Sequence, residues 1–147
     1  MSKTLKILLV FAGLGILVGG SVVFYVFNKP HRNIEEEAPA FTMVASSFYN
    51  EFSSDEAAGN LKFGNQVIQV NGPIAEVSLN GAEATIVLND EMEGISCTLD
   101  STAVANNEEK IKALSIGDQV TLKGKCDGFD MIMGVVLTKC FFVNDED

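Results

Sequence analysis

The chain of 147 residues has room for one membrane segment and one modest domain, and it is too short for two domains with cores of their own. Its 10 basic and 20 acidic residues give a formal charge of −10. Six of the basic residues and all of the acidic ones follow Arg32, so that part carries 6 − 20 = −14 and repels nucleic-acid phosphates and anionic lipids. The same charge favours solubility and would attract a cationic partner or Ca²⁺.

The first element is an apolar segment from Leu5 to Phe27, in which Lys6 is the one charged residue and the 21 positions from Ile7 to Phe27 carry no charge. At a rise of about 1.5 Å per residue, such a helix crosses a hydrocarbon core of about 30 Å. Phe24, Tyr25 and Phe27 stand where an aromatic belt would lie, and Pro30 stops the helix. A cleaved signal peptide is the alternative, but its apolar core is usually shorter, about 7–15 residues. We therefore expect residues 1–32 to form an uncleaved membrane anchor.

The charges that flank this segment set its expected orientation. Lys3 and Lys6 at its start, together with the N-terminal amine, slightly outnumber Lys29 and Arg32 after it. The positive-inside rule then keeps the N-terminus in the cytoplasm and places the C-terminal part in the periplasm. Within the segment, Gly15 and Gly19 form a GxxxG pattern, which is a candidate dimerisation face.

Residues 33–40 are polar and acidic and are interpreted as a linker to a domain over residues 41–147. The apolar residues at the start of that domain recur at helical spacing. We therefore expect a helix from about Met43 to Ala58, ended by Gly59-Asn60. Its apolar stripe is expected to belong to the core and consists of Ala45, Phe48 and Phe52.

After this helix the period of the apolar residues changes to two, which is typical of strands. Gly72-Pro73 interrupts the first strand at a bend, and Asn80-Gly81 is a hairpin turn signal. A second helix, Ala105–Leu114, separates the third strand from the fourth, and Asp127–Asp130 is expected to be a turn. This order predicts an all-β fold with added helices: a five-stranded OB-fold Greek-key barrel preceded by one helix. The expected strands are Val67–Leu79, Ala84–Leu88, Ile95–Leu99, Gln119–Cys126 and Met133–Val143.

Several short motifs carry a family resemblance over roughly residues 38–143. The most specific is the run Leu114-Ser-Ile-Gly-Asp-Gln-Val-Thr-Leu-Lys-Gly-Lys-Cys-Asp-Gly128, followed by Val135-Val-Leu-Thr-Lys-Cys140. Others are Glu56-Ala-Ala58 before Phe63-Gly64, Val67-Ile-Gln-Val-Asn-Gly72 and Ile95-Ser-Cys97. On these residues the chain resembles the tRNA_anti-like OB-fold family of small bacterial envelope proteins. The resemblance implies the OB-fold; it brings no catalytic residues and does not itself imply RNA binding.

The three cysteines raise the question of a disulfide, because an exported domain normally oxidises a suitable pair. Cys126 and Cys140 fall on strands that neighbour each other in an OB barrel, so they are the preferred pair. A bridge there would close a loop of about 15 residues and stabilise the domain by about 3 kcal/mol in the chain-entropy model. Cys97–Cys140 is a second option. Three reduced, buried thiols are a third, favoured if the domain is cytoplasmic.

Residue types that usually carry catalysis or hold a metal are scarce after the membrane segment. The one histidine, His31, stands beside that segment, which excludes Ser-His-Asp and Cys-His devices in the barrel. The sequence has no phosphate-binding or dinucleotide-binding motif and no CxxC pair for zinc. The acidic stretch Asn89–Gly94 lacks the full spacing of a calcium loop and is expected to be a polar turn. We therefore expect no enzymatic activity, no cofactor and no metal.

OB-folds bind ligands across their second and third strands and the adjoining loops. We accordingly expect a membrane-tethered, non-catalytic binding or adaptor module of the bacterial cell envelope, whose partner is another envelope protein or a small ligand. One alternative is a structural homo-oligomer built through Gly15 and Gly19. The other is a nucleic-acid-binding OB-fold using Lys123, Lys125 and Lys139, which acidity and location disfavour. The possible ligand face comprises Ala84, Ile86, Leu88, Asp90, Glu93, Ile95 and Cys97.

Overall fold

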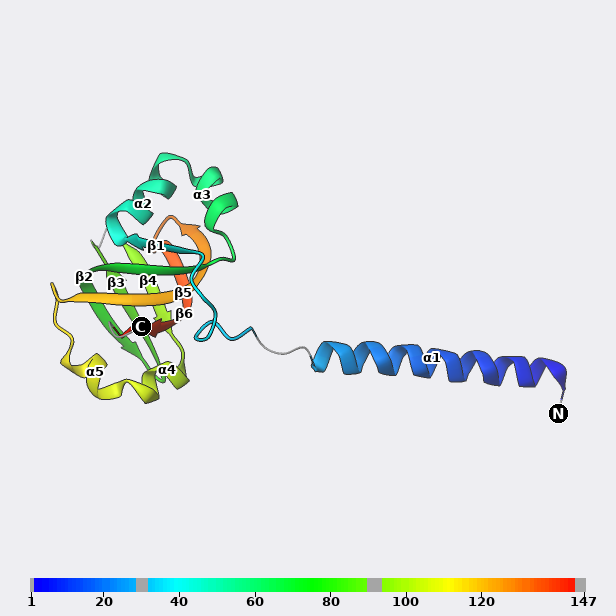
Figure 1. Ribbon diagram of the computed structural model, residues 1–147. Helices are drawn as coiled ribbons and strands as arrows, with labels where there is room; N and C mark the ends of the chain where they lie inside the picture. Colours follow the sequence, from blue (N-terminus) through cyan, green and yellow to red (C-terminus); the bar gives the residue numbers. More distant parts are fainter. Residues whose placement is uncertain (1, 29–31, 90–93, 145–147) are drawn as a thin grey trace. The chain divides into compact units, whose positions relative to one another are not determined.

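The computed structural model describes residues 2–28, 32–89 and 94–144 and divides the chain into two compact units, Met1–Arg32 and Asn33–Asp147. The first unit contains the helix α1, Lys3–Phe27 (Figure 1), and all 25 of its residues are exposed. Its mean hydropathy of 2.6 and its length are sufficient to cross a membrane, although a signal sequence would share both properties. Pro30 and His31 lie outside the described residues.

The second unit is a closed barrel of five strands, which confirms the predicted OB-fold. The strands are β2 (Val67–Asn80), β3 (Glu83–Leu88), β4 (Ile95–Leu99), β5 (Gln119–Asp130) and β6 (Gly134–Phe142). They pair in the order β2-β3-β4-β6-β5, and β5 returns to pair with β2. A short additional strand, β1 (Phe41–Val44), runs parallel to β2.

The long strand β2 closes the barrel because its two halves have different partners. Val67–Pro73 pairs with β5, and Ile74–Asn80 pairs with β3. The change falls at the predicted Gly72-Pro73 bend, and a register shift between Ile74 and Glu76 follows it. The β2–β3 hairpin turns at Gly81, as the Asn80-Gly81 signal predicts.

The core fills the barrel and extends under the helices at one end. Inward side chains alternate along most of the length of the strands, and Ile68, Ile86 and Leu137 are among those with no exposed surface. At the end covered by α2 (Ala45–Ser54) and α3 (Glu56–Phe63), the rings of Phe48, Phe52 and Phe63 pack together. The helices α4 (Ser101–Asn106) and α5 (Glu108–Ala113) lie at the opposite end of the barrel (Figure 1).

The predicted single helix over residues 43–58 is instead a strand followed by two helices. β1 takes Phe41–Val44, and α2 ends at Ser54 because Asp55 adopts an extended backbone, with φ −158° and ψ 96°. The side chain of Asp55 accepts a hydrogen bond from the N–H of Ala58 and so starts α3. Gly59, predicted to end the helix, lies inside α3, where a Cβ would come within 2.7 Å of the Phe52 ring.

Two more boundaries differ for similar local reasons. The predicted helix 105–114 is two short helices, since Asp100 caps α4 through the N–H of Ala103 and α5 begins anew at Glu108. The predicted turn 127–130 lies within β5, and the chain reverses at residues 131–133 instead. There Asp130 Oδ1 accepts hydrogen bonds from the N–H groups of Ile132 and Met133.

The segment predicted as a linker packs on the barrel. Ile34 is 2% exposed, and the carbonyl oxygen of Glu35 accepts a hydrogen bond of 2.6 Å from Lys123 Nζ on β5. Further along, the N–H of Ala40 donates to the carbonyl of Val67. Residues 33–40 therefore hold the start of the second unit against β2 and β5.

Candidate functional site

The five described residues of the predicted ligand face lie inside the barrel. Ala84, Ile86 and Leu88 on β3 and Ile95 and Cys97 on β4 all have no exposed surface. The β3–β4 register explains this, because it sets Ile86 opposite Cys97 and Leu88 opposite Ile95, so that all five side chains point to one side of the sheet. This corrects the predicted face: the accessible residues of these strands lie on the other side, where Ser96 on β4 is nevertheless only 2% exposed. Asp90 and Glu93 lie outside the described residues.

The outward side of the same strands is a polar surface. Glu83, Thr85 and Val87 alternate with the buried residues of β3. Thr85 stands opposite Ser78 on β2 and Thr98 on β4, which gives a row of three hydroxyl groups, and Val87 stands opposite Glu76. These strands are those across which OB-folds bind their ligands. We call this surface the sheet face, and it consists of Glu76, Ser78, Glu83, Thr85, Val87 and Thr98.

The composition of this part of the chain limits what the sheet face can bind. From Val67 to Asp100 the sequence contains no lysine, arginine, histidine or aromatic residue. The same stretch contains six acidic residues, Glu76, Glu83, Asp90, Glu91, Glu93 and Asp100. Single-stranded nucleic acid is usually held by positive charge along its backbone and by aromatic rings that stack on its bases. The three strands of the sheet face supply neither.

The aromatic residues of the second unit are used in its core. Phe63 makes edge-to-face contacts with Phe41 and Phe48 at centroid distances of 5.0 and 5.1 Å, and Tyr49 lies 6.3 Å from Phe129. Among the described residues after Arg32, no aromatic side chain is exposed. Phe41, Tyr49, Phe129, Phe141 and Phe142 are half-buried, so stacking on bases would have to use partly covered rings that already pack against the core.

The predicted lysine cluster on β5 and β6 surrounds a carboxylate. Lys125 Nζ lies 2.6 Å from Asp127 Oδ1, and Thr138 Oγ1 donates a hydrogen bond of 2.7 Å to Asp127 Oδ2. Partial burial by itself would raise the pKa of Asp127, but these hydrogen bonds and the charges of Lys125 and Lys139 outweigh it and hold the pKa below its usual range. Lys123 donates to Glu35 instead, so the trio does not form an open basic patch.

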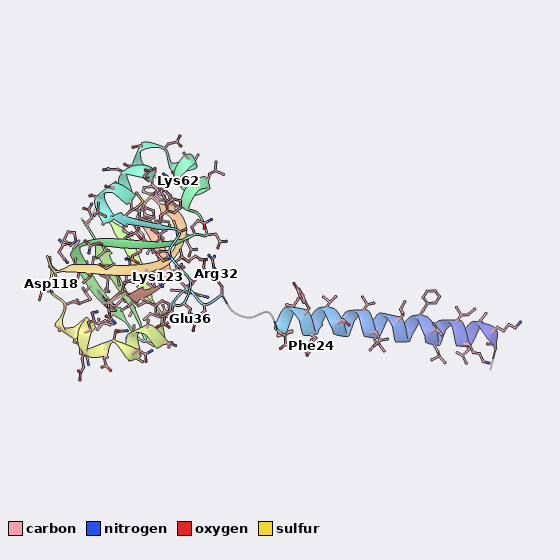
Figure 2. All side chains as sticks on the ribbon, in the orientation of Figure 1. Phe24, Arg32, Glu36, Lys62, Asp118 and Lys123 are labelled. Atoms are coloured by element: carbon pink, nitrogen blue, oxygen red, sulfur yellow. The ribbon has the colours of Figure 1, made fainter. Side chains whose placement is uncertain are left out.

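The remaining lysines also have partners within the second unit. Lys62 forms a salt bridge of 3.2 Å with Glu51 and lies over the ring of Phe63. Figure 2 shows Lys62 and Lys123 on separate parts of the barrel. Lys110 and Lys112, on α5, bind Asn144 and Glu108 respectively. Phosphates would have to compete with these contacts at Lys62, Lys110 and Lys112.

The Asp127 cluster makes stability sensitive to acid. Because the folded pKa of Asp127 is lowered, its contribution is present above the unfolded value, about 3.9, and is lost as pH falls through the folded pKa. The Asp127 side chain is 38% exposed, so we expect Asp127→Asn to cost less than about 1 kcal/mol at pH 7. The cost should shrink further on acidification from pH 7 to 3, measured as urea midpoints. Glu83→Gln, an exposed carboxylate on β3, is the control, and an equal loss in both variants would contradict the assignment.

All three cysteines are buried free thiols, and the structure does not confirm the predicted Cys126–Cys140 bridge. In the β5–β6 register Cys126 stands opposite Leu137, and burial raises the pKa of its thiol. Cys140 lies instead against Cys97 of β4. Burial, and then its hydrogen bond with Cys97, hold the pKa of Cys140 well above its usual range.

A cavity of about 320 Å³ lies between the β2–β3 hairpin and the two helices α4 and α5. Its size is at the lower end of the range for small-molecule sites. Apolar groups such as Leu79, Val104 and Ile111 line it, and the Glu108–Lys112 ion pair stands at its border.

The dimerisation face at Gly15 and Gly19 remains a prediction.

Comparison with known proteins gives a family and a fold. The model of the tRNA_anti-like family matches residues 1–141. A solved protein from Klebsiella pneumoniae, described as a "putative nucleic acid-binding lipoprotein", is 16% identical with a TM-score of 0.54; the match covers 79% of this chain and all of that one. The asparaginyl-tRNA synthetase of Pyrococcus horikoshii is 15% identical over 56% of this chain and 21% of its own, with a TM-score of 0.45. Curated protein sequences gave no match.

Proposed function

Because this chain belongs to the tRNA_anti-like family of OB-fold proteins, we propose that it is a non-catalytic binding module, tethered to a membrane by α1, whose sheet face binds another protein of the bacterial cell envelope or a small ligand. One observation carries this proposal. The sheet face occupies the strands on which OB-folds bind, yet the chain from Val67 to Asp100 has neither positive charge nor aromatic rings. Hydroxyl groups and carboxylates suit hydrogen bonding to a polar or cationic protein surface better than to nucleic acid.

The tether is supported by the length and hydropathy of α1 and by the aromatic residues at its end. The likeness to a lipoprotein of Klebsiella pneumoniae is consistent with a place in the envelope. We propose that the domain faces the periplasm. A reporter enzyme that is active only outside the cytoplasm, fused after Asp147, should be active, and a reporter active only inside should be silent.

The absence of catalysis is proposed from the distribution of reactive groups. The only histidine of the chain precedes the domain. In the part that the structure describes, no group of three or more histidine, cysteine or acidic side chains could hold a metal ion. The buried thiols of Cys126 and Cys140 are kept protonated by their raised pKa values, which makes them poor nucleophiles.

Site-specific photo-crosslinking in native membranes tests the sheet face. A photoreactive amino acid at Thr85 or at Thr98 is expected to capture a recurrent partner protein or small molecule. The same amino acid at Leu61, which is 89% exposed on α3, is the matched control and should not capture it. Adducts from Leu61 alone, or none from the sheet face, would contradict the proposal.

Nucleic-acid binding is the competing function, since the Klebsiella pneumoniae protein is described in those terms. We expect the full-length protein in detergent to show no saturable binding to a fluorescent single-stranded oligonucleotide up to about 100 µM in low salt, the weak end of ordinary non-specific binding. Fluorescence anisotropy at two salt concentrations measures this. Micromolar affinity that falls steeply with salt would replace the protein-binding proposal with nucleic-acid binding.

A further inference from the structure

Cys140 reaches the barrel interior through an irregular residue in β6. Val135 and Leu137 point inward, so regular alternation would send Lys139 inward and Cys140 outward. Instead Lys139 is exposed and Cys140 has no exposed surface. Between the pairs Lys125–Thr138 and Lys123–Phe141, β6 has two residues where β5 has one, which defines a bulge. Lys139 is the bulged residue, and its φ of 51° is a left-handed conformation that lysine adopts only when its surroundings impose it.

The facing strand leaves space for the sulfur that the bulge brings in. The single β5 residue opposite the bulge is Gly124. A Cβ at Gly124 would collide with Cys140 Sγ and would lie 3.1 Å from the carbonyl oxygen of Thr138. A side chain on β5 at this point would therefore displace Cys140. The bulge and the glycine together set the position of one thiol.

The thiol beside Cys140 belongs to β4. The side chains of Cys140 and Cys97 are in hydrogen-bonding contact, and Cys97 Sγ lies 3.9 Å from the carbonyl oxygen of Ile95. Leu137 is paired with Cys97 on its β4 side and with Cys126 on its β5 side. Leu137 thus stands between Cys126 and Cys97, whereas the bulge turns Cys140 toward Cys97.

We propose that Cys97 and Cys140 are a disulfide-forming pair that fastens β6 to β4, and that Cys126 remains a free thiol. Oxidation removes two protons and two electrons from the pair and gives them to an external disulfide, such as that of oxidised glutathione or of a thiol oxidase. One cysteine thiolate attacks that disulfide and releases one thiol; the second thiolate then attacks the mixed disulfide and releases the other. Because neither sulfur is exposed in the folded barrel, this exchange takes place before the barrel closes.

The bridge would strengthen the strand pairing that has the fewest residue pairs in the barrel, that of β4 with β6. β4 and β6 are joined by only three residue pairs, Ile95–Cys97 with Val135–Leu137, and in parallel register. A covalent link at the end of this ladder also closes a long loop of chain that contains α4, α5 and β5. We expect the oxidised protein to melt roughly 10 °C above the reduced one, from the usual stabilisation by a bridge across a long loop.

Refolding the full-length protein in detergent tests the pairing wherever the domain resides in the cell. The reduced, unfolded chain is refolded with oxidised and reduced glutathione, free thiols are blocked with a maleimide, and the product is digested with trypsin without reduction. Cleavage after lysine places the three cysteines in separate peptides, 63–110, 126–139 and 140–147. We expect peptides 63–110 and 140–147 linked, and peptide 126–139 carrying the label. A link to 126–139, or three labelled thiols, would overturn the proposal.

Variants separate the pairing from general folding. Cys126→Ser should form the bridge as the parent does, and Cys97→Ser and Cys140→Ser should form no intramolecular bridge. Lys139→Gly keeps the positive φ available and should also form it in full yield; because it removes the cleavage site between Cys126 and Cys140, it is made together with Cys126→Ser. Gly124→Ala places a methyl group on Cys140 Sγ and should lower the yield several-fold. Full bridging in Gly124→Ala, or none in a folded Lys139→Gly, would overturn the role assigned to the bulge.

Discussion

Phe63→Ala is expected to lower the free energy of unfolding of the barrel by about 3–5 kcal/mol, the usual cost of truncating a buried phenylalanine. Phe63 has no exposed surface, and its ring contacts three others, those of Phe41, Phe48 and Phe52, at centroid distances of 5.0, 5.1 and 5.7 Å. Alanine would leave a cavity between α2, α3 and β1 and would remove the edge-to-face contacts.

Denaturant unfolding of the full-length protein in detergent, followed by far-ultraviolet circular dichroism, measures this effect. The sequence has no tryptophan, so fluorescence is a weak probe. Leu61→Ala is the matched control, because Leu61 lies on the same helix and is 89% exposed. It should change stability by no more than about 0.5 kcal/mol. Equal losses in both variants would show that α3 contributes helix propensity and not core packing.

Gly134→Ala is expected to cost about 3 kcal/mol or more. Gly134 begins β6 with φ 73°, and a Cβ there would collide with the carbonyl oxygen of Gly94. That carbonyl cannot easily move, because it accepts a hydrogen bond from the N–H of Val135 at the start of the β4–β6 ladder. The left-handed conformation alone costs about 1–2 kcal/mol for a residue with a side chain, and the collision adds to it.

Gly81→Ala isolates the conformational part of this cost. Gly81 has a similar φ of 67° in the β2–β3 hairpin, but no atom lies within 4 Å of its added Cβ. We expect it to lose about 1–2 kcal/mol, the cost of the conformation alone. The difference between the two urea midpoints then measures the contact with Gly94. If the two variants were equally destabilised, the close approach between β6 and Gly94 would have no energetic weight.

The sequence predicts the barrel well because strand period and turn chemistry are local properties. β4 has the predicted bounds, Ile95–Leu99, and the bend at Gly72-Pro73 and the hairpin at Gly81 are where glycine and proline indicate. The family resemblance rests on the same strands, and the family match over residues 1–141 confirms it. The bounds of the helices are harder to predict, since the break at Asp55 depends on a side-chain cap, and the good helix-forming residues Glu56-Ala57-Ala58 that follow it favour a continuous helix.

The candidate site was harder to predict, because alternation defines two faces of a strand but does not say which is inside. Ala84, Ile86 and Leu88 form the apolar face of β3. They are buried in the core of the barrel and therefore cannot contact a ligand. The other side of β3, with the half-buried residues Thr85 and Val87, is mainly polar, and nothing in its pattern distinguishes it from an ordinary solvent-facing side. The inward position of Cys140 could not be predicted for a similar reason. One extra residue at Lys139 exchanges the inward and outward positions in the rest of β6, and no residue type in the sequence predicts that bulge.

The parallel pairing of β1 with β2 has a mechanical consequence. Any tension that enters the domain through Arg32 reaches β1 soon after the packed segment that contains Ile34. Four consecutive residues, Phe41–Val44, are in register with Ile68–Asn71. A pull along β1 would load the backbone hydrogen bonds of this pairing in shear, all at once, and would not peel them apart one by one. With α1 as the proposed membrane anchor, a pull on the domain would therefore meet this four-residue pairing before it reached the other strands of the barrel.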